Sequence, residues 1–176
     1  MTIATQTAIE YQTRGVLVSL TDEEYAQARN VGEGRNAQMH GVGDMPYYIR
    51  DLMEDDDTAS FAAACAEAAV AQTTGLKWHG KVWHRSEHHL HKNEPDVGDS
   101  IEVRRIRSPH NGLCVRQKDL GQGKFIFVAY PIPETRFRQV DVIGWMPADQ
   151  AWEVGYDAFT ATRRVPLTDI NIWRGR

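Results

Sequence analysis

The chain has 176 residues, of which 41% are hydrophobic and 25% are charged, and its formal net charge at pH 7 is −4. This length predicts one domain, residues 1–176, with a core large enough to fold without disulfides or a structural metal. The acidic total argues against a protein that coats nucleic acid by charge alone. No apolar run is long enough for a membrane helix, and the first ten residues lack the pattern of a secretory signal. Cys65 and Cys114 fit no metal or redox spacing, which predicts free thiols in a reducing cytoplasm.

The first predicted elements are a strand and a helix, which together form an N-terminal unit over residues 16–35. Val16–Leu20 is a short apolar stretch that predicts the strand. Thr21, with Glu24 three residues later, has the pattern of a capping box, which predicts a helix over residues 22–35.

A loop and a second helix follow. Residues 40–57 contain glycines, a proline and an acidic run, which predict a loop with a short helix near residues 48–53. Asp57 or Thr58 is expected to cap an alanine-rich helix that ends at Gly75.

The remainder of the chain predicts short strands separated by turns. We expect strands at residues 101–107, 124–130 and 140–146, and a short strand or a helical turn at residues 113–118. Residues 148–176 are expected to form an irregular extension with one or two short strands. Two early helices followed by a small sheet predict an α+β or α/β domain.

Glu67 is the only charged residue between Asp57 and Lys77. The surrounding helix is apolar on almost every side, which is typical of a helix packed on several faces. A carboxylate there is costly unless a metal ion or a basic partner needs its charge. The alternative is that Glu67 lies on one exposed stripe of the helix.

A pair of carboxylates flanks a turn in the next segment. Residues 98–100, Gly-Asp-Ser, predict a tight turn. In a hairpin, this turn would make Asp96 and Glu102 cross-strand partners on one face, with Cβ atoms about 5 Å apart. Such a pair favours a hard divalent cation such as Mg²⁺ or Mn²⁺. Asp99 is expected to be a turn residue, and it would replace Asp96 if the register differed.

An acid on an alanine-rich helix, then Pro-Asp, then Glu-x-basic on a strand resembles the PD-(D/E)XK nuclease superfamily, which includes many phage-encoded members. The resemblance covers about residues 57–147. It implies a restriction-endonuclease-like α/β core, with a mixed central sheet flanked by helices. It also implies that Glu67, Asp96 and Glu102 bind the catalytic Mg²⁺ or Mn²⁺, and that Arg104 occupies the position of a catalytic lysine.

The arginine at position 104 departs from the pattern of that superfamily. Arg104 cannot lose its proton in a protein, so it cannot act as a general base. It can still stabilise charge on a phosphoryl oxygen or hold a phosphate with two hydrogen bonds. Water activation would then fall to the metal, or to Lys118 from a neighbouring element.

Basic residues are concentrated between positions 104 and 118, with no acid among them. A locally basic face on an acidic protein is compatible with binding a phosphate backbone at one site. The residues expected to contact DNA are Arg105, Arg107, Arg116 and Lys118. The alternative is an ordinary solvated charged surface.

Histidines offer a competing metal site. Five of them lie close together, with two tryptophans among them: His79, His84, His88, His89 and His91. Imidazoles at this density can bind a transition metal, and their pattern partly resembles a cupin motif. No second cupin motif follows, and the glutamate comes too early. The alternative is an exposed hairpin with the tryptophans packed beneath it.

The leading hypothesis is a metal-dependent nuclease that hydrolyses phosphodiester bonds in DNA, with Mg²⁺ or Mn²⁺ as its cofactor. Its location would be cytoplasmic, or the host cytoplasm if the protein is phage-encoded. The alternatives are a catalytically inactive DNA-binding or interaction relative of the same fold, and a histidine-rich cupin-like enzyme. No membrane partner is expected, and a homodimer is compatible with the hypothesis because two DNA strands need two sites.

Overall fold

The computed structural model describes residues 13–39, 55–108 and 110–176. The strands are β1 (Val16–Ser19), β2 (Ile101–Arg105), β3 (Leu113–Arg116), β4 (Phe125–Pro131), β5 (Gln139–Pro147), β6 (Tyr156–Phe159), β7 (Thr162–Val165) and β8 (Asn171–Ile172). The α-helices are α1 (Asp22–Met39), α2 (Asp56–Thr74), α3 (His88–His91) and α4 (Ala148–Val154). Short 3-10 turns are η2 (Arg85–Glu87), η3 (Gln117–Asp119) and η4 (Pro133–Thr135). The short helix predicted near residues 48–53 lies outside the described residues.

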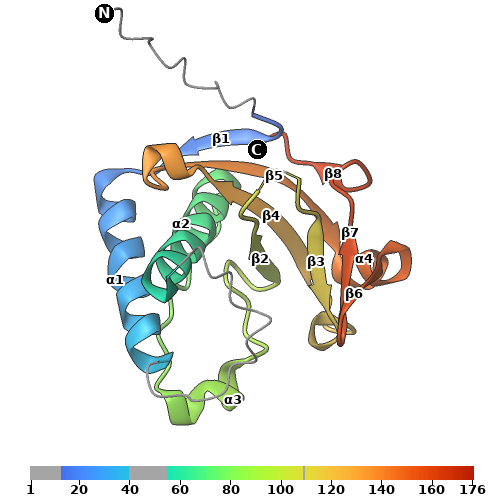
Figure 1. Cartoon of the computed structure of the whole chain (residues 1–176), viewed down its shortest axis with the longest axis horizontal. Helices are drawn as coiled ribbons and strands as arrows, with labels where there is room; N and C mark the ends of the chain where they lie inside the picture. Colours follow the sequence, from blue (N-terminus) through green and yellow to red (C-terminus); the bar gives the residue numbers. More distant parts are fainter. Residues whose placement is uncertain (1–12, 40–54, 109) are drawn as a thin grey trace, which may run out of the picture.

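A mixed sheet lies at the centre of the fold (Figure 1). Its strands follow the order β1-β5-β4-β2, and β8 pairs with β5. The pairing of β2 with β4 is parallel, whereas the other pairings in this sheet are antiparallel. Helix α2 packs on one face of the sheet, and α1 packs against α2. The prediction of a mixed α/β architecture is therefore confirmed.

A second, smaller sheet covers the other face of the central sheet. It has the order β3-β7-β6 and packs together with α4. The side chains of β4 show why both faces are covered. Phe127 and Ala129 lie in the core under α2, whereas Ile126 and Val128 lie in the core under the small sheet. A strand that is buried on both faces has a nearly continuous apolar sequence, which is the signal that predicts β4.

Helix α1 begins with the predicted capping box. The Thr21 backbone N–H donates to Glu24 Oε2 at 2.8 Å, and the Glu24 N–H donates to Thr21 Oγ1 at 3.2 Å. The helix ends at Met39, about one turn beyond the prediction. It contains Gly32, where an added Cβ would lie 2.7 Å from the Phe61 Cα of α2. The glycine is thus explained by close packing of two helices rather than by a helix end.

Helix α2 begins earlier than the sequence predicts. Its N-cap is Asp55, whose carboxylate accepts a hydrogen bond from the Thr58 backbone N–H at 2.7 Å. The prediction of Asp57 or Thr58 as the cap is therefore wrong. Gly75 ends the helix in the left-handed conformation, with φ of 67°, as expected.

The C-terminal part is more regular than predicted. It contains α4 and three strands, of which β6 and β7 pair with each other and β8 joins the central sheet. Strands β1 and β8 both pair with β5. The central sheet therefore includes strands from outside residues 57–147, the range that the resemblance covers. Within the described ranges, no helix has the length and apolar character that crossing a membrane requires.

Candidate functional site

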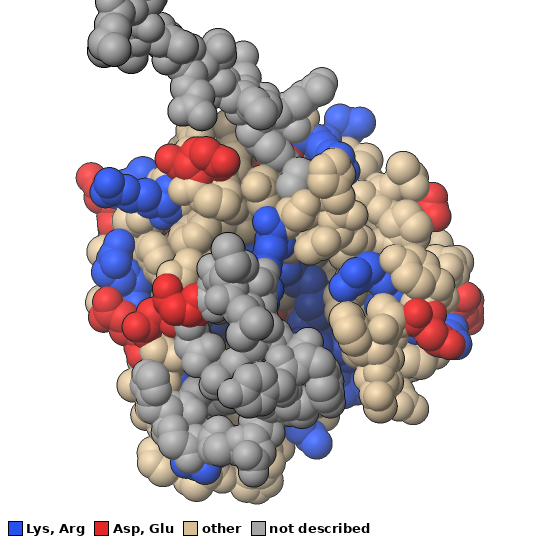
Figure 2. Space-filling view, viewed as in Figure 1, with Lys and Arg blue, Asp and Glu red and all other residues tan. Residues whose placement is uncertain are grey.

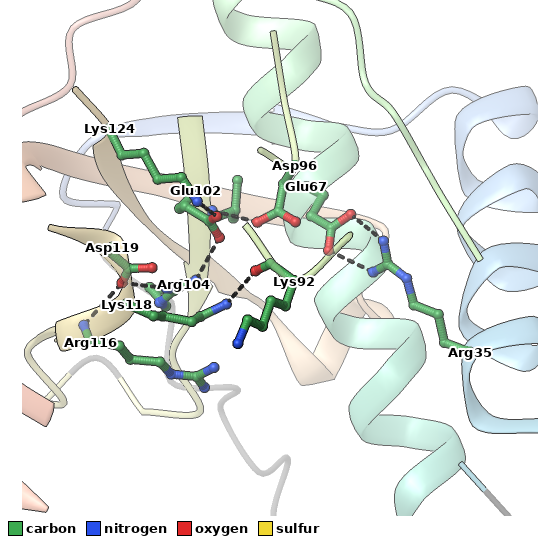
Figure 3. Close-up of polar contacts among 11 residues, drawn as sticks. Arg35, Glu67, Lys92, Asp96, Glu102, Arg104, Arg116, Lys118, Asp119 and Lys124 are labelled. Carbon is green, nitrogen blue, oxygen red and sulfur yellow. Dashed lines mark hydrogen bonds and ion pairs between the residues drawn. The ribbon is translucent and has the colours of Figure 1, made fainter. Parts of the chain in front are cut away.

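Glu67 lies in the middle of α2 and is 5% exposed, so the alternative of an exposed stripe is wrong. Arg35 of α1 forms two hydrogen bonds with its carboxylate, at 2.6 Å to Oε1 and 2.9 Å to Oε2. The Trp78 indole N–H donates to Oε2 at 3.0 Å. The positive partner that the buried carboxylate requires is therefore an arginine of the neighbouring helix (Figure 3).

The position of Arg35 is fixed from two sides. Besides binding Glu67, its Nε donates to the Lys81 carbonyl oxygen at 3.0 Å. Burial alone would lower the pKa of Arg35, but the adjacent Glu67 carboxylate raises it above its ordinary value. Arg35 therefore stays charged.

Asp96 lies beside a tight turn, as predicted. Gly98 in this turn has a φ of 56°, and Val97 bridges Ile101 in antiparallel register. That register places Asp96 opposite Glu102, which is the relationship expected from the sequence. The Val103 backbone N–H donates to Asp96 Oδ2 at 2.8 Å and fixes the carboxylate.

Glu102 on β2 is buried at 4% exposure and has two cationic partners. Lys124 Nζ lies 2.5 Å from Oε1, and Arg104 Nη1 lies 3.1 Å from Oε2. Lys124 immediately precedes β4, which runs parallel to β2 with Phe125 beside Ile101. The parallel pairing thus brings a buried lysine to Glu102 from the adjacent strand.

Arg104 bridges two acids inside the protein. Its Nη2 lies 2.7 Å from Asp119 Oδ2, which also accepts a hydrogen bond from the Arg116 backbone N–H at 2.9 Å. Burial alone would lower the pKa of Arg104, but Asp119 and Glu102 raise it above its ordinary value. Within the described chain, Arg104 Nε and Asp119 Oδ1 are buried without hydrogen-bond partners. The guanidinium that was expected to hold a substrate phosphate is therefore committed to two carboxylates.

A pocket of about 330 Å³ opens next to Asp96. Its described lining includes two carboxylates, Glu94 and Asp96, and a larger number of basic side chains. These basic residues are Arg35, Lys81, Lys92, Arg116 and Lys118. Lys and Arg side chains are visible in the hollow in the middle of the face shown in Figure 2. An excess of positive charge in a concave site favours an anionic ligand.

The carboxyl group of Asp96 has an unusual acidity. Burial raises its pKa, the nearby Glu67 and Glu102 carboxylates raise it further, and the result is a pKa of about 7. The hydrogen bond from Val103 opposes this shift. Among the described residues, Asp96 Oδ1 has no hydrogen-bond donor, and Asp96 lines the pocket. A carboxyl group that titrates near neutrality is suited to accept or donate a proton in the pocket.

Lys118 lies at the edge of the same pocket. Its Nζ donates to the Lys92 carbonyl oxygen at 2.8 Å. Burial lowers the pKa of Lys118, and the nearby Glu102 carboxylate opposes that effect. Lys118 can therefore release a proton more readily than an exposed lysine.

The predicted DNA-binding residues divide into two groups. Arg116 and Lys118 line the pocket, whereas Arg105 and Arg107 are not among its lining residues. Contact of any of the four with DNA stays a prediction.

The second half of the histidine-rich segment, residues 85–91, is helical, so the interpretation of the whole segment as an exposed hairpin is wrong. His84 begins η2 by accepting a hydrogen bond from the Ser86 backbone N–H, and α3 follows directly. His91 stacks on Trp83 with ring centroids 3.5 Å apart, and its Nδ1 lies 2.6 Å from Glu94 Oε1. His79 and His88 also line the pocket.

No metal site is formed by the residues that the structure describes: no three His, Cys, Asp or Glu side chains are grouped so that they could hold an ion. This applies to the histidines and to the three carboxylates alike. Glu67 and Glu102 direct their oxygens to Arg35, Lys124 and Arg104, so the side chains as arranged do not fit an additional dication. The expected Mg²⁺ or Mn²⁺ stays a prediction.

Three residues of the site were not anticipated from the sequence. Arg35 lies at the predicted end of a helix, Lys124 at the start of a strand, and Asp119 just after the basic stretch. For Lys124 a signal exists, because a lysine that opens a strongly apolar strand is close to the core. The pairing of Arg35 with Glu67 has no local signal.

Comparisons of the chain with models of protein families, with curated proteins and with solved structures found no match. The resemblance to the PD-(D/E)XK superfamily is therefore supported only by the residues quoted for it. The chemistry of the pocket is the remaining basis for a function.

Proposed function

We propose that the chain hydrolyses phosphodiester bonds of DNA in the pocket beside Asp96. The observation that carries this proposal is a carboxyl group with a pKa of about 7 in a pocket whose lysine and arginine side chains outnumber its carboxylates. Phosphate is the common biological anion that such a lining favours. Hydrolysis in addition needs a group that takes a proton from water near neutral pH, and Asp96 meets that requirement.

In this mechanism Asp96 is the general base. The oxygen of a water molecule bonds to phosphorus while the bond from phosphorus to the leaving oxygen breaks. Asp96 takes a proton from the water, and Lys118 gives one to the leaving oxygen. Bulk water then restores both groups. Arg116 and Lys92 stabilise the negative charge on the phosphoryl oxygens.

Lys124 is a second cation beside Glu102. The resemblance implies a lysine on the same strand as Glu102, at the position of Arg104, whereas Lys124 reaches Glu102 from the adjacent strand. In the proposal Lys124 and Arg104 hold the charge of Glu102 in place, and Glu102 in turn keeps the pKa of Asp96 high. Both cations thus act through the acids and do not touch the substrate.

The test is a cleavage assay with supercoiled plasmid, linear duplex and single-stranded DNA. Each substrate is incubated with Mg²⁺, Mn²⁺ or a chelator. Asp96→Asn should lower the rate at least about 100-fold, which is the usual contribution of a general base. Asp99→Asn is the matched control, because Asp99 is exposed in the same turn and should leave the rate unchanged. Absence of cleavage by the unmodified chain in every condition would reject the proposal, as would full activity of Asp96→Asn.

A second candidate is a DNA-binding protein without catalysis. It is favoured by one observation: Arg35, Lys124 and Arg104 already neutralise two of the three acids expected to bind a metal. In that case the chain shifts DNA in a gel, Arg116→Ala weakens the shift, and no metal produces cleavage. A measurable turnover excludes this candidate.

A further inference from the structure

The pocket beside Asp96 is small relative to a DNA duplex. Its volume of about 330 Å³ is near the lower end of the range of roughly 300–1,000 Å³ that is typical of small-molecule sites. The attacking water must lie within about 3 Å of Asp96, and the phosphate must lie beside that water inside the pocket. A pocket of this size admits a nucleotide-sized group, whereas two paired strands are too wide to enter it.

The walls of the pocket come from separate parts of the fold. Arg35 of α1 approaches from one side of Asp96, and Lys118 and Arg116 lie on the other side (Figure 3). The hydrogen bond from Lys118 Nζ to the Lys92 carbonyl oxygen, at 2.8 Å, joins the segment after β3 to the segment after α3. Because Arg35 is paired with Glu67, the cations available to the phosphates of a strand that passes Asp96 are those of Lys92, Arg116 and Lys118.

An ordered aromatic pair lies in the same pocket. Trp83 and His91 stack with an interplanar angle of 5°, and Glu94 fixes His91. Both rings belong to residues of the pocket lining. Lys81 Nζ also lies over the Trp83 ring, 4.9 Å from its centroid, so a base that stacks on Trp83 takes the place of Lys81 or His91. Unpaired bases bind by stacking on such rings, whereas the bases of a duplex are already stacked within the helix.

From the volume, the cations and the aromatic pair together, we infer that the ligand of this pocket is an unpaired DNA strand, either a free end or a single-stranded segment. The inference deepens the proposed function, because it names the form of DNA that reaches Asp96. Duplex DNA is then a substrate only where its strands have separated.

The test measures binding apart from cleavage. The full chain with Asp96→Asn is titrated into a labelled single-stranded oligonucleotide, and into the same oligonucleotide annealed as a blunt duplex, with fluorescence anisotropy as the readout. We expect at least about tenfold tighter binding of the single strand. Adding Trp83→Ala should reduce single-strand affinity by about tenfold. Phe159→Ala, which removes an exposed ring of β6, is the control and should have no effect.

Salt dependence provides a second readout. Each of Arg116→Ala and Lys118→Ala should lower the slope of log affinity against log salt for the single strand by about 0.7. Lys77→Ala, at an exposed lysine outside the pocket lining, should leave that slope unchanged.

The outcomes separate the two proposals. Equal or tighter binding of duplex, binding of neither form, or an unchanged affinity of Trp83→Ala would overturn the inference. A preference for single strands without cleavage by the unmodified chain rejects the catalytic function alone. Cleavage of intact duplex without a preference for single strands rejects the inference alone.

Discussion

Two groups of acids lie close together in this molecule, but their electrostatic surroundings differ. In the inner cluster, Glu102 and Asp119 are buried, and Lys124 and Arg104 neutralise them. In the pocket, Asp96 forms no ion pair with any described residue, and its pKa rises to about 7. A buried acid with matched cations stabilises the structure, whereas a buried acid without them is available for protons and ligands.

The largest expected effect is the loss of the buried lysine. Lys124→Met leaves Glu102 with Arg104 alone, in a place where water cannot replace the missing charge. We expect a loss of about 3 kcal/mol in the free energy of unfolding, measured with urea. Lys77→Met, at an exposed lysine, should change it by less than about 0.5 kcal/mol. Adding Glu102→Gln to Lys124→Met should recover part of the loss, and a further large loss in that double variant would contradict the role of the pair.

The second effect concerns the pH dependence of stability. The pKa of Asp96 is about 7 in the folded chain and 3.8 without its surroundings. Between these values the folded state binds more protons at Asp96 than the unfolded state does, so the contribution of Asp96 to stability is complete below about pH 4 and is lost as the pH rises to about 7. After discounting for partial exposure, we expect Asp96 to account for about 2 kcal/mol of that fall.

Asp96→Asn should remove this slope and make the chain more stable than the unmodified protein at pH 8. Urea unfolding at a series of pH values is the measurement. If the two proteins have parallel profiles, Asp96 is ionised normally, and the contrast between the two groups of acids is wrong.

A smaller effect is expected when the ion pair between Arg35 of α1 and Glu67 of α2 is removed. Arg35 carries a positive charge close enough to interact with Asp96 as well as with Glu67. In Arg35→Met, the uncompensated Glu67 should raise the pKa of Asp96, so the midpoint of the pH–rate profile should move upward by about 0.5 to 1 pH unit. Arg35→Lys keeps the charge and should leave the midpoint near that of the unmodified chain. A downward movement in Arg35→Met would contradict the proposed electrostatics.

The smallest effect is expected at the rim of the pocket. Glu94 binds both Lys81 and His91, but it does so in contact with solvent. Glu94→Gln should leave the urea midpoint unchanged, because exposed ion pairs contribute little to stability. It should weaken binding of single-stranded DNA slightly, because His91 loses its fixed orientation on Trp83. A clear loss of stability would show that the ion pairs of Glu94 stabilise the fold as the buried pairs of Glu102 and Asp119 do.

The parts of the fold that were predictable have local physical causes. The Thr21–Glu24 capping box, the ending at Gly75 and the apolar strand β4 each follow from a few neighbouring residues. The start of α2 was misplaced because several consecutive acids can each serve as a cap, and only the geometry selects Asp55. The strands β6 and β7 were not located because they are four residues long and largely polar or exposed.

In the candidate site, local sequence signals located the acids but not the cations that neutralise them. The isolation of Glu67 in an apolar helix indicated a buried charge, and the turn after Val97 indicated that Asp96 faces Glu102. The identity of the cations was not predictable, because Arg35 and Lys124 reach the acids only through the packing of α1 on α2 and the parallel pairing of β4 with β2.

The close approach of α1 and α2 at Gly32 affects the acidity of Asp96, which belongs to neither helix. Gly32 lies one turn before Arg35, and any side chain there would meet the backbone of Phe61 and wedge the helices apart. A wider gap would draw the guanidinium away from Glu67 and leave more negative charge facing Asp96. The absence of a side chain at Gly32 thus keeps the two helices close, and their separation influences the proton affinity of Asp96.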